Sequence, residues 1–364
     1  MHHVAIIFGT RPEAIKLAPV AHAIDKHPFL KATVLNTGQH DVLMPTIMDT
    51  FGVRVHEHLR TLTGGQTLGE LGTKLLGTLT ERLAVLRPEL VIVQGDTLSA
   101  QMGAMAAFYL GIPVGHVEAG LRTYNPQAPF PEESSRRIIS LMATLHFAPT
   151  FGAAANLKRE RVSGFIEVTG NPVVDALLRI KSHLKAQPRR TGRYRMVATI
   201  HRRENHPYVD HIFQALAELA EDPETEVLIP VHANPVVKDA AARVLQPSRV
   251  RTLAPMDYMD WLGVMQTADL IISDSGGVQE EAPVLGIPLL VAREVTERPE
   301  VIKTRHAYLV GHQKNKITKM ARAARARTLS FSEAESPFGR GDAGEQIARC
   351  VAQYFMNTAV EAVP

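Results

Sequence analysis

Residues 90–120 read LVIVQGDTLSAQMGAMAAFYLGIPVGHVEAG, and this stretch decides the fold. It contains two short apolar runs, Leu90–Val93 and Val114–Val117, which look like buried strands. The segment between them, Leu98–Leu110, is expected to form a helix. A strand, a helix and a second strand in this order make a βαβ unit, and such units build parallel sheets.

The same alternation continues on both sides of this stretch. Further strands in the first half are predicted at Val4–Phe8, Thr33–Asn36 and Leu145–Ala148, and a further helix at Gln66–Leu86. After residue 195 the predicted strands are Met196–Ile200, Val227–Val231, Val250–Leu253, Leu270–Ser273, Leu289–Val291 and Tyr308–Val310. The chain is therefore expected to be an α/β protein with two Rossmann-like domains.

The domain boundary is expected between the two series of strands, where residues 181–195 are polar and basic and suit a core poorly. A length of 364 residues also suits two α/β domains better than one. We place an N-terminal domain at 1–172 and a C-terminal domain at 173–344. An amphipathic helix within 345–364 is expected to pack back onto the first domain.

The composition disfavours several classes of protein. Lys and Arg total 40 against 37 Asp and Glu, a near balance that disfavours a dedicated nucleic-acid-binding protein. The single cysteine, Cys350, rules out an intramolecular disulfide and fits a reducing compartment. There is no secretory signal pattern and no apolar stretch long enough to span a bilayer. We therefore expect a cytoplasmic protein without nucleic-acid or membrane partners.

Most of the unusual side chains follow predicted strands, at the sheet edge where open α/β folds bind ligands. Residues 9–13, GTRPE, follow the first strand and begin a helix. Arg11 and Lys16 would lie near the N-terminus of that helix, where anions bind. The alternative is an ordinary strand-to-helix turn with solvated basic residues, and the pattern favours the anion site.

Two acids follow neighbouring strands, Asp96 after Leu90–Val93 and Glu118 after Val114–Val117. A right-handed βαβ unit places both acids at the same sheet edge. Paired carboxylates in one site repel each other, which separates an acid from a base. The alternative is that Asp96 caps the next helix and that Glu118 pairs with Arg122, and the spacing alone does not decide between these interpretations.

A third acid, Glu132, lies in the proline-rich segment 129–133, PFPEE, ahead of a helix predicted at Ser134–Met142. Acids are common at helix starts because they interact favourably with the helix dipole. The pattern alone therefore favours a capping role. A functional role is indicated by its position in this loop, shortly after Glu118.

In the second half, His201 follows the strand Met196–Ile200 and is itself followed by two arginines. A histidine and arginines at a strand end suit a diphosphate or a proton relay. Solvation at the surface is the alternative.

The more specific phosphate signal lies later in the second half. Ser275, Gly276 and Gly277 stand between a predicted strand and a predicted helix, where glycines let a phosphate approach backbone N–H groups. Glu281, one turn into the helix, is suited to ribose hydroxyls. Arg298, after the following strand, adds a cation.

Taken together, these motifs resemble those of the non-hydrolysing UDP-N-acetylglucosamine 2-epimerases. The resemblance covers nearly the whole chain and rests on residues 8–16, 95–97, 116–122, 201–204, 274–283 and 296–300. Several long motifs in the same order make chance agreement implausible. The resemblance implies the two-domain GT-B architecture, with the substrate bound in a cleft between the domains.

The resemblance also implies the reaction. Members of the family remove the proton at carbon 2 and expel UDP from carbon 1, and UDP adds again to the 2-acetamidoglucal after a proton returns to the opposite face. Asp96, Glu118 and Glu132 match the family's catalytic carboxylates, and His201 matches its cleft histidine. The division of acid and base roles does not follow from the sequence. The resemblance implies no cofactor and no metal ion.

The resemblance assigns further residues to ligands. The residues that match substrate-binding positions are Arg11, Lys16, Asp96, Glu118, His201, Met256, Trp261, Ser275, Gly276, Gly277, Glu281 and Arg298. Those that match a second, allosteric nucleotide-sugar site are Gln39, His40, Arg202 and His232. Met256 and Trp261 replace the glutamine and phenylalanine usual near the uracil, and Ser135 replaces a common asparagine before Arg136. A UDP-amino sugar as substrate, a homodimer and a role in envelope polysaccharide synthesis are likewise implied.

Three other functions stay open. A hydrolysing 2-epimerase would release free sugar, but such enzymes usually carry arginine after Gly-Asp, where this chain has Thr97. A GT-B glycosyltransferase would share the phosphate-binding half but needs an acceptor site instead of acids for proton transfer on two faces. An epimerase of a related UDP-amino sugar would share all of the motifs.

Overall fold

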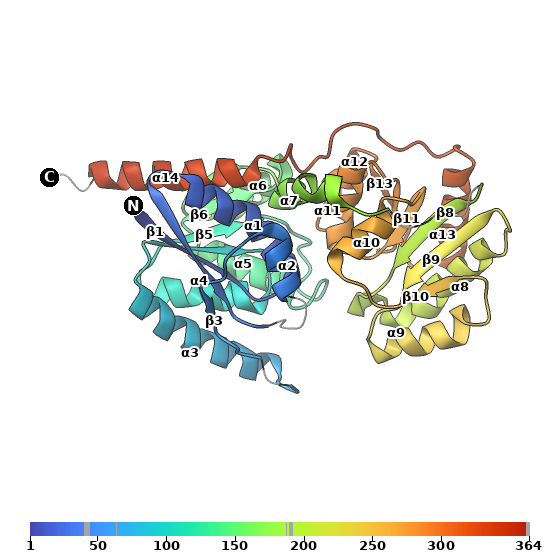
Figure 1. Ribbon diagram of the computed structural model, residues 1–364, viewed down its shortest axis with the longest axis horizontal. Helices are drawn as coiled ribbons and strands as arrows, with labels where there is room; N and C mark the ends of the chain where they lie inside the picture. Colours follow the sequence, from blue (N-terminus) through green and yellow to red (C-terminus); the bar gives the residue numbers. More distant parts are fainter. Residues whose placement is uncertain (40–43, 63, 187, 189–191, 362–364) are drawn as a thin grey trace. The chain divides into compact units, whose positions relative to one another are not determined.

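The structure is a computed structural model that describes residues 1–39, 44–62, 64–186, 188 and 192–361. The chain forms two compact units, shown in Figure 1: the first comprises Met1–Arg179 and Phe338–Pro364, and the second comprises Ile180–Pro337. The first unit thus extends past its predicted boundary at residue 172. Its C-terminal segment begins at Phe338, before the predicted start at residue 345. The backbone N–H of Asn171 donates to the Phe338 carbonyl, and that of Gly344 donates to the carboxylate of Asp175, so these two stretches are held together.

In the described part of the first unit, seven parallel strands form one sheet in the order β3-β2-β1-β4-β5-β6-β7. Their bounds are β1 His2–Phe8, β2 Leu30–Asn36, β3 Glu57–His58, β4 Leu90–Gln94, β5 Val114–Val117, β6 Leu145–Ala148 and β7 Phe165–Val168. The central strands are buried on both faces, which explains their nearly continuous apolar sequence.

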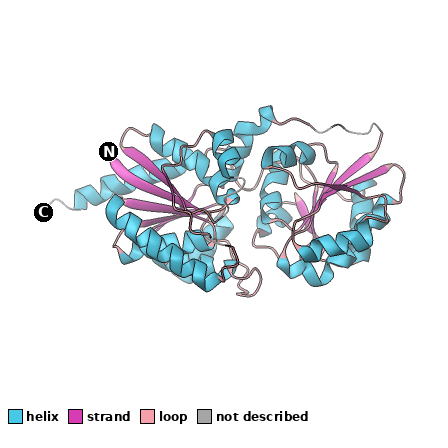
Figure 2. Cartoon of the chain, turned by 60° about the horizontal axis from the view of Figure 1, so that its bottom comes forward, coloured by secondary structure: helices cyan, strands magenta, loops and turns pink. Residues whose placement is uncertain are grey.

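Helices cover both faces of this sheet, as Figure 2 shows. Their bounds are α1 Arg11–Lys26, α2 Met44–Phe51, α3 Leu68–Leu86, α4 Leu98–Tyr109, α5 Glu132–Met142, α6 Phe151–Glu160, α7 Pro172–Ile180 and α14 Ala343–Glu361. Apolar side chains of α3, α4 and α5 share one core cluster with Val91 and Val93 of β4. The C-terminal helix α14 packs against α1.

The described residues of the second unit form a six-stranded parallel sheet in the order β10-β9-β8-β11-β12-β13. The strand bounds are β8 Tyr194–Thr199, β9 Thr225–Pro230, β10 Arg251–Leu253, β11 Leu270–Ser273, β12 Leu289–Val291 and β13 Ala307–Leu309. The helical elements are η1 Lys181–His183, η2 Arg203–Tyr208, α8 Val209–Ala220, α9 Pro235–Ala240, η3 Ala241–Leu245, α10 Tyr258–Met265, α11 Gly276–Leu285, α12 Pro299–Lys303 and α13 Lys314–Arg325.

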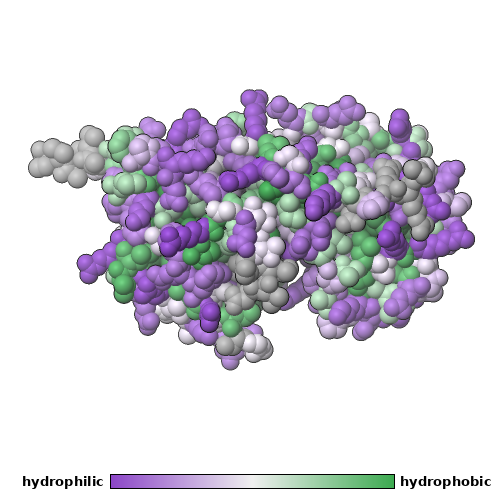
Figure 3. Space-filling view, viewed as in Figure 1, coloured by the Kyte–Doolittle hydropathy of each residue, from purple (hydrophilic) through white to green (hydrophobic). Residues whose placement is uncertain are grey.

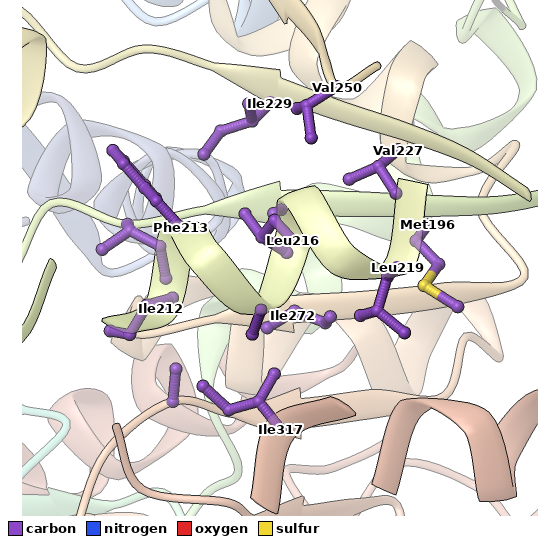
Figure 4. Close-up of a cluster of buried hydrophobic side chains, with 14 of the residues drawn as sticks. Met196, Ile212, Phe213, Leu216, Leu219, Val227, Ile229, Val250, Ile272 and Ile317 are labelled. Atoms are coloured by element: carbon purple, nitrogen blue, oxygen red, sulfur yellow. The ribbon is translucent and has the colours of Figure 1, made fainter. Parts of the chain in front are cut away.

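Helix α8 supplies much of the core on one face of the second sheet. Figure 4 shows Phe213, Leu216 and Leu219 of α8 in a cluster with Met196 of β8 and Ile272 of β11. All five side chains are almost fully buried. At about 25 cal/mol per Å² of apolar surface, each such side chain contributes roughly 1.5–3 kcal/mol of burial free energy.

The strand order reverses in each sheet next to its first strand. In the first unit the reversal lies between β1 and β4, and in the second unit between β8 and β11. Connections on the two sides of such a point run to opposite faces of the sheet, which leaves a crevice at the carboxyl ends of the strands. The α/β class and the two Rossmann-like units predicted from the sequence are confirmed.

Two helices begin earlier than the sequence predicted, and both changes matter for function. α5 begins at Glu132 and not at Ser134, so Glu132 belongs to the first turn of the helix. α11 begins at Gly276 and not at Val278, so its glycine pair supplies the first N–H groups of the helix. Among the residues that the structure describes, every helix is too short or too polar to cross a lipid bilayer.

Helix α13 is rich in lysine and arginine, and several of these side chains form ion pairs. Arg322 lies 2.8 Å from Glu218, and Arg325 lies 2.8 Å from Glu224 and also pairs with Asp222. These acids lie in α8 or just after it. These two arginines of α13 are therefore ion-paired within the unit.

Candidate active site

At the reversal point of the first sheet, Glu13 connects two neighbouring turns. Its Oε2 accepts hydrogen bonds from the backbone N–H groups of Gly9 at 3.0 Å and Thr10 at 2.7 Å, and its Oε1 accepts one from the Thr97 hydroxyl at 2.6 Å. The side chain is buried, and this burial raises the pKa of Glu13 to about 7 although the hydrogen bonds oppose the shift. The turn after β1 and the turn after β4 are thus held side by side.

Gly9 is required where these turns meet. A Cβ atom at this position would lie 2.1 Å from the hydroxyl oxygen of Ser99 and 2.2 Å from that of Thr37. Both distances are far below van der Waals contact. A larger residue would also come within 2.9 Å of the Ser99 Cβ, so it fits only if Ser99 of α4 and Thr37 after β2 move away.

Glu118 follows β5 and is held as a buried anion. Its Oε2 accepts hydrogen bonds from Lys16 Nζ at 2.6 Å and from Gln94 Nε2. The backbone φ of Glu118 is +66°, in the left-handed region that non-glycine residues seldom adopt and that often marks functional sites. The alternative pairing with Arg122 is wrong, because the Arg122 guanidinium binds both carboxylate oxygens of Glu160.

Lys16 therefore has a different position from the one that the motif suggested. It lies inside α1, where its ammonium group forms a buried ion pair with Glu118. Arg11, the first residue of α1, is half-buried, and its guanidinium has no hydrogen bond or ion pair to any described residue. Of these two cations, Arg11 is the better placed to meet an incoming anion.

Asp96 lies in the turn after β4 and is partly exposed. Its Oδ2 is 2.6 Å from Nη2 of Arg136, a residue of α5. The cap of α4 is Thr97, whose hydroxyl oxygen accepts a hydrogen bond from the Ala100 N–H at 3.1 Å. The alternative interpretation of Asp96 as a helix cap is therefore wrong.

Glu132 and Glu133 have different environments although they are neighbours in α5. Glu133 is fully buried and accepts hydrogen bonds from the backbone N–H groups of Thr123 and Tyr124, both at 3.0 Å. Glu132 makes no capping hydrogen bond, and its Oε2 is buried without a donor in the described part of the chain. A buried carboxylate oxygen without a donor is unfavourable, and at a sheet edge it indicates a ligand position.

His116 supports the turn that carries Asp96, although the sequence did not single it out. It lies in β5, is fully buried, and its Nε2 is 2.8 Å from the carbonyl oxygen of Gly95. Burial lowers the pKa of His116 to about 3, so the ring is neutral and its Nε2–H donates to Gly95. The backbone next to Asp96 is thereby fixed. The signal in the sequence was a histidine inside a buried strand.

In the second unit, the buried carboxylate of Asp274 holds the turn after β8. It accepts hydrogen bonds from the backbone N–H of His201 at 3.0 Å and of Arg202 at 2.9 Å, and from Asn205 Nδ2 at 3.0 Å. In the sequence, Asp274 is visible only as part of the motif 274–283. Because it bonds the backbone of the His201 turn, Asp274 fixes this turn against the end of β11.

The N-terminus of α11 has the features of an anion site. A Cβ on Gly276 would lie 2.7 Å from Arg298 Nη1 and 3.1 Å from Arg202 Nη2, so two guanidinium groups approach the first helical residue. Ser275, the N-cap residue, makes no side-chain capping hydrogen bond. Unpaired N–H groups at a helix N-terminus and two nearby cations favour binding of a diphosphate.

Arg298 is held in place by buried acids. Its Nε lies 2.6 Å from Glu280, and its Nη1 donates to Glu297. Glu297 also accepts a hydrogen bond from Arg293 at 2.8 Å. The guanidinium of Arg298 therefore keeps one orientation beside Gly276.

The remaining substrate candidates of the second unit lie on α10 and α11 or just before them. Glu281 is buried and accepts a hydrogen bond from the Tyr258 hydroxyl at 2.8 Å. Met256 and Trp261 both pack against a cluster that contains Val197. Tyr258 joins α10, the helix that carries Trp261, to α11, and an indole on α10 is suited to stacking on a nucleotide base.

The four allosteric candidates are divided between the two units. Gln39, in the first unit, accepts a hydrogen bond from the Ser99 hydroxyl at 2.7 Å, and His40 lies outside the described residues. In the second unit, the exposed ring of His232 lies 5.8 Å from that of His201, and Arg202 lies beside Gly276. An allosteric role of these residues stays a prediction.

Where the structure describes the chain, no three His, Cys, Asp or Glu side chains gather into a metal-binding cluster. The candidate site is built from carboxylates, cations and backbone N–H groups.

Comparison with known proteins gives a consistent result. A family model described as UDP-N-acetylglucosamine 2-epimerase matches residues 22–352. The UDP-N-acetylglucosamine 2-epimerase of Salmonella typhimurium is 39% identical, over 96% of this chain and 98% of that protein. The crystal structure of UDP-GlcNAc 2-epimerase from Neisseria meningitidis bound to UDP-GlcNAc has a TM-score of 0.89 and 35% identity, and covers 96% of this chain and 100% of that one.

A second solved structure is similar over the same extent. It is the UDP-GlcNAc 2-epimerase of Methanocaldococcus jannaschii in complex with UDP-GlcNAc and UDP, with a TM-score of 0.84 and 31% identity. It covers 96% of this chain and 99% of that chain. The similarity therefore extends over both units and not over one Rossmann-like half alone.

Replacing Lys16 with methionine should destabilise the first unit strongly. The change leaves Glu118 buried without its cation, which typically costs about 3–5 kcal/mol. Urea denaturation followed by circular dichroism measures the free energy of unfolding. Lys26→Met is the matched control, because Lys26 lies in the same helix but is exposed. Equal effects of the two substitutions would contradict the importance of the buried pair.

The raised pKa of Glu13 predicts a pH-dependent stability. In the unfolded chain Glu13 loses its proton near its ordinary pKa of 4.5, and in the folded chain only near 7. Between these values the folded state binds more protons, so stability falls as the pH rises. Glu13→Gln removes this dependence, and the stability difference between variant and wild type should shift by about 2.5 kcal/mol between about pH 5 and pH 8.

Glu70→Gln is the control for this measurement. Glu70 holds the same position in the capping box of α3 as Glu13 does in α1, but it is exposed and its pKa is lowered by hydrogen bonds to Thr67. Its effect on stability should be constant over the same pH range. A constant difference for Glu13→Gln as well would show that Glu13 does not titrate there.

Proposed function

This chain belongs to the UDP-N-acetylglucosamine 2-epimerase family, and from that premise we propose that it interconverts UDP-N-acetylglucosamine and UDP-N-acetylmannosamine without hydrolysis. The observation that carries the proposal is the gathering of acids at one sheet edge. Asp96 and Glu118 follow the neighbouring strands β4 and β5, and α5, which packs against α4 and β5, begins with Glu132. Proton transfer on two faces of a sugar ring needs at least two such groups.

The second unit supplies the proposed nucleotide site. Backbone N–H groups at Gly276 and the guanidinium groups of Arg202 and Arg298 bind the diphosphate. Glu281 accepts hydrogen bonds from ribose hydroxyls, and Trp261 stacks on the uracil. His201, held by Asp274, lies in the turn beside this anion site and is suited to contact the diphosphate as it leaves.

In the proposed reaction a carboxylate of the first unit removes the proton at carbon 2. The electrons of the C2–H bond form the C1–C2 double bond, and the C1–O bond breaks with its electron pair on UDP. The products of this half-reaction are UDP and 2-acetamidoglucal. A second acid then delivers a proton to the other face of carbon 2, and a UDP oxygen attacks carbon 1 to restore the nucleotide sugar.

The environments of the three acids support different tasks. Oε2 of Glu118 already accepts from Lys16 and Gln94, which suits a fixed negative charge near the reacting carbons. Glu132 has a buried oxygen without a donor, and Asp96 is bound through Oδ2 and partly exposed. We therefore assign proton transfer foremost to Asp96 and Glu132, one on each face of the ring.

Deuterium incorporation tests this function. The protein is incubated with UDP-N-acetylglucosamine in deuterated water, and carbon 2 is followed by proton NMR. The expected result is deuterium at carbon 2 of an intact nucleotide sugar and the appearance of the manno epimer. Asp96→Asn should reduce exchange at least about a hundredfold, because an amide cannot exchange the proton, while UDP affinity stays unchanged.

Other outcomes separate the alternatives. Free N-acetylmannosamine would indicate a hydrolysing epimerase, and exchange with another UDP-amino sugar alone would indicate a related substrate. No exchange with any UDP-amino sugar would rule out both kinds of epimerase. Unchanged exchange by Asp96→Asn would remove Asp96 from the reaction.

We also propose a homodimer that forms through α3, α4 and α5. α4 packs between α3 and α5, and these helices carry bulky exposed apolar residues: Val85 is 69% exposed, Phe108 55%, Tyr109 64% and Leu141 74%. Figure 3 shows green apolar surface among the purple around α3 and α4. Exposed apolar residues on adjacent helices are typical of subunit interfaces.

Phe108→Arg should convert this dimer into monomers, because it places a charge in the apolar contact. Light scattering after size exclusion measures the mass. Phe151→Arg is the matched control, since Phe151 is 84% exposed but lies on α6. A wild-type mass of one chain, or dimers of the Phe108 variant, would contradict this interface.

A further inference from the structure

We propose that Arg136 is a positioning residue that fixes the side chain of Asp96 for proton transfer, an inference that rests on the proposed epimerase function. Arg136 is buried, and its guanidinium contacts two acids at once. Nη2 lies 2.6 Å from Asp96 Oδ2, and Nη1 lies 3.0 Å from Glu133 Oε2. The resemblance to the family gave this residue no role.

The anchor of this arrangement is Glu133. Its carboxylate is fully buried and bound by two backbone N–H groups, those of Thr123 and Tyr124. Rotation of the Glu133 side chain would break these bonds, so its carboxylate stays in place. The ion pair between Arg136 Nη1 and this carboxylate therefore fixes the orientation of the guanidinium. The other side of the guanidinium is therefore presented to Asp96 in one geometry.

The backbone of Asp96 is fixed by other residues. His116 binds the Gly95 carbonyl, and Glu13 binds the hydroxyl of Thr97. Neither contact restricts rotation of the Asp96 side chain. In the described part of the chain, the contact to the Asp96 carboxylate comes from Arg136. A loss of this contact should leave the turn intact and the carboxylate free to rotate.

Arg136 also connects Asp96 to the second proposed proton-transfer residue. Glu132 and Arg136 are four residues apart in α5, so their side chains leave the same face of the helix. The guanidinium therefore ties the carboxylate of one acid to the helix that carries the other. Two acids on opposite faces of a sugar must keep a set separation, and a misplacement of about 1 Å can reduce a rate roughly a hundredfold.

A buried arginine can also be merely structural, and the chain offers a matched example. Arg122 is equally buried and binds both oxygens of Glu160, but it contacts none of Asp96, Glu118 or Glu132. Lysine at either position keeps the charge and loses the two-sided fork of the guanidinium. Both lysine variants should lose similar thermal stability. A difference in turnover between them therefore reports on the placement of Asp96 and not on folding.

The test compares Arg136→Lys and Arg122→Lys with the wild type. Deuterium exchange gives kcat and KM for UDP-N-acetylglucosamine, calorimetry gives the Kd of UDP, and circular dichroism gives Tm. For Arg136→Lys we expect kcat to fall roughly ten- to a hundredfold, with KM and the Kd of UDP within about twofold of the wild type. For Arg122→Lys we expect kcat within about twofold.

A second variant covers the case in which lysine is not tolerated. Arg136→Ala leaves a space beside Asp96 and Glu133 into which a free guanidinium ion fits, so a low, non-denaturing concentration of guanidinium should restore part of kcat. The same addition should not raise the turnover of Arg122→Ala, where the vacated space lies beside Glu160 and not beside Asp96. Rescue of turnover, rather than of Tm alone, is what a merely structural arginine would not show.

Two failures can be told apart. Wild-type protein that exchanges no proton would overturn the proposed function and this inference with it. Wild-type exchange together with an equal kcat loss in Arg136→Lys and Arg122→Lys, or an Arg136→Ala variant that guanidinium does not rescue, would overturn the positioning role alone.

Discussion

The parallel pairing of the strands is the constraint on which the rest of the structure depends. Parallel strands bring all their carboxyl ends to one edge of a sheet, and the reversal of strand order opens a crevice there. In the first unit this geometry brings the turns after β1, β4 and β5 together, with Glu13, Asp96 and Glu118. In the second unit it places the turns after β8 and β11 side by side, and with them the His201 turn and the start of α11.

A second constraint follows from burial, since a buried carboxylate needs donors. Glu133 and Asp274 obtain theirs from backbone N–H groups of a neighbouring turn, and Glu118 obtains its from a lysine and an amide. Each of these acids thereby joins elements that lie far apart in the sequence. The contrast is Glu132, whose buried oxygen has no donor among the described residues. Because Glu132 also lies beside Asp96 and Glu118 in the proposed site, this oxygen is suited to act on a substrate.

Apolar runs predicted both sheets, and turn motifs predicted where the polar side chains gather. These signals are local: a strand buried on both faces is apolar, and a glycine at a helix start is visible in the sequence. The partners of the acids were not predictable in the same way. The sequence offers Arg122, four residues away, as an ion-pair partner for Glu118. The cation that Glu118 binds is Lys16, which is 102 residues away. In the sequence Arg136 is noted only as the residue after Ser135, and only the position of Asp96 in space gives it a role.

The path of the chain has a consequence for its synthesis. The second unit is one continuous segment, Ile180–Pro337, whereas the first unit needs α14, which follows it in the sequence. On the ribosome the second unit emerges complete before α14 has been made. Until then, the surface of α1 that α14 will cover is exposed to solvent. The unit that begins the chain is thus the last to be completed. Until α14 is made, the surface of α1 that it covers must be kept from aggregating while the second unit folds.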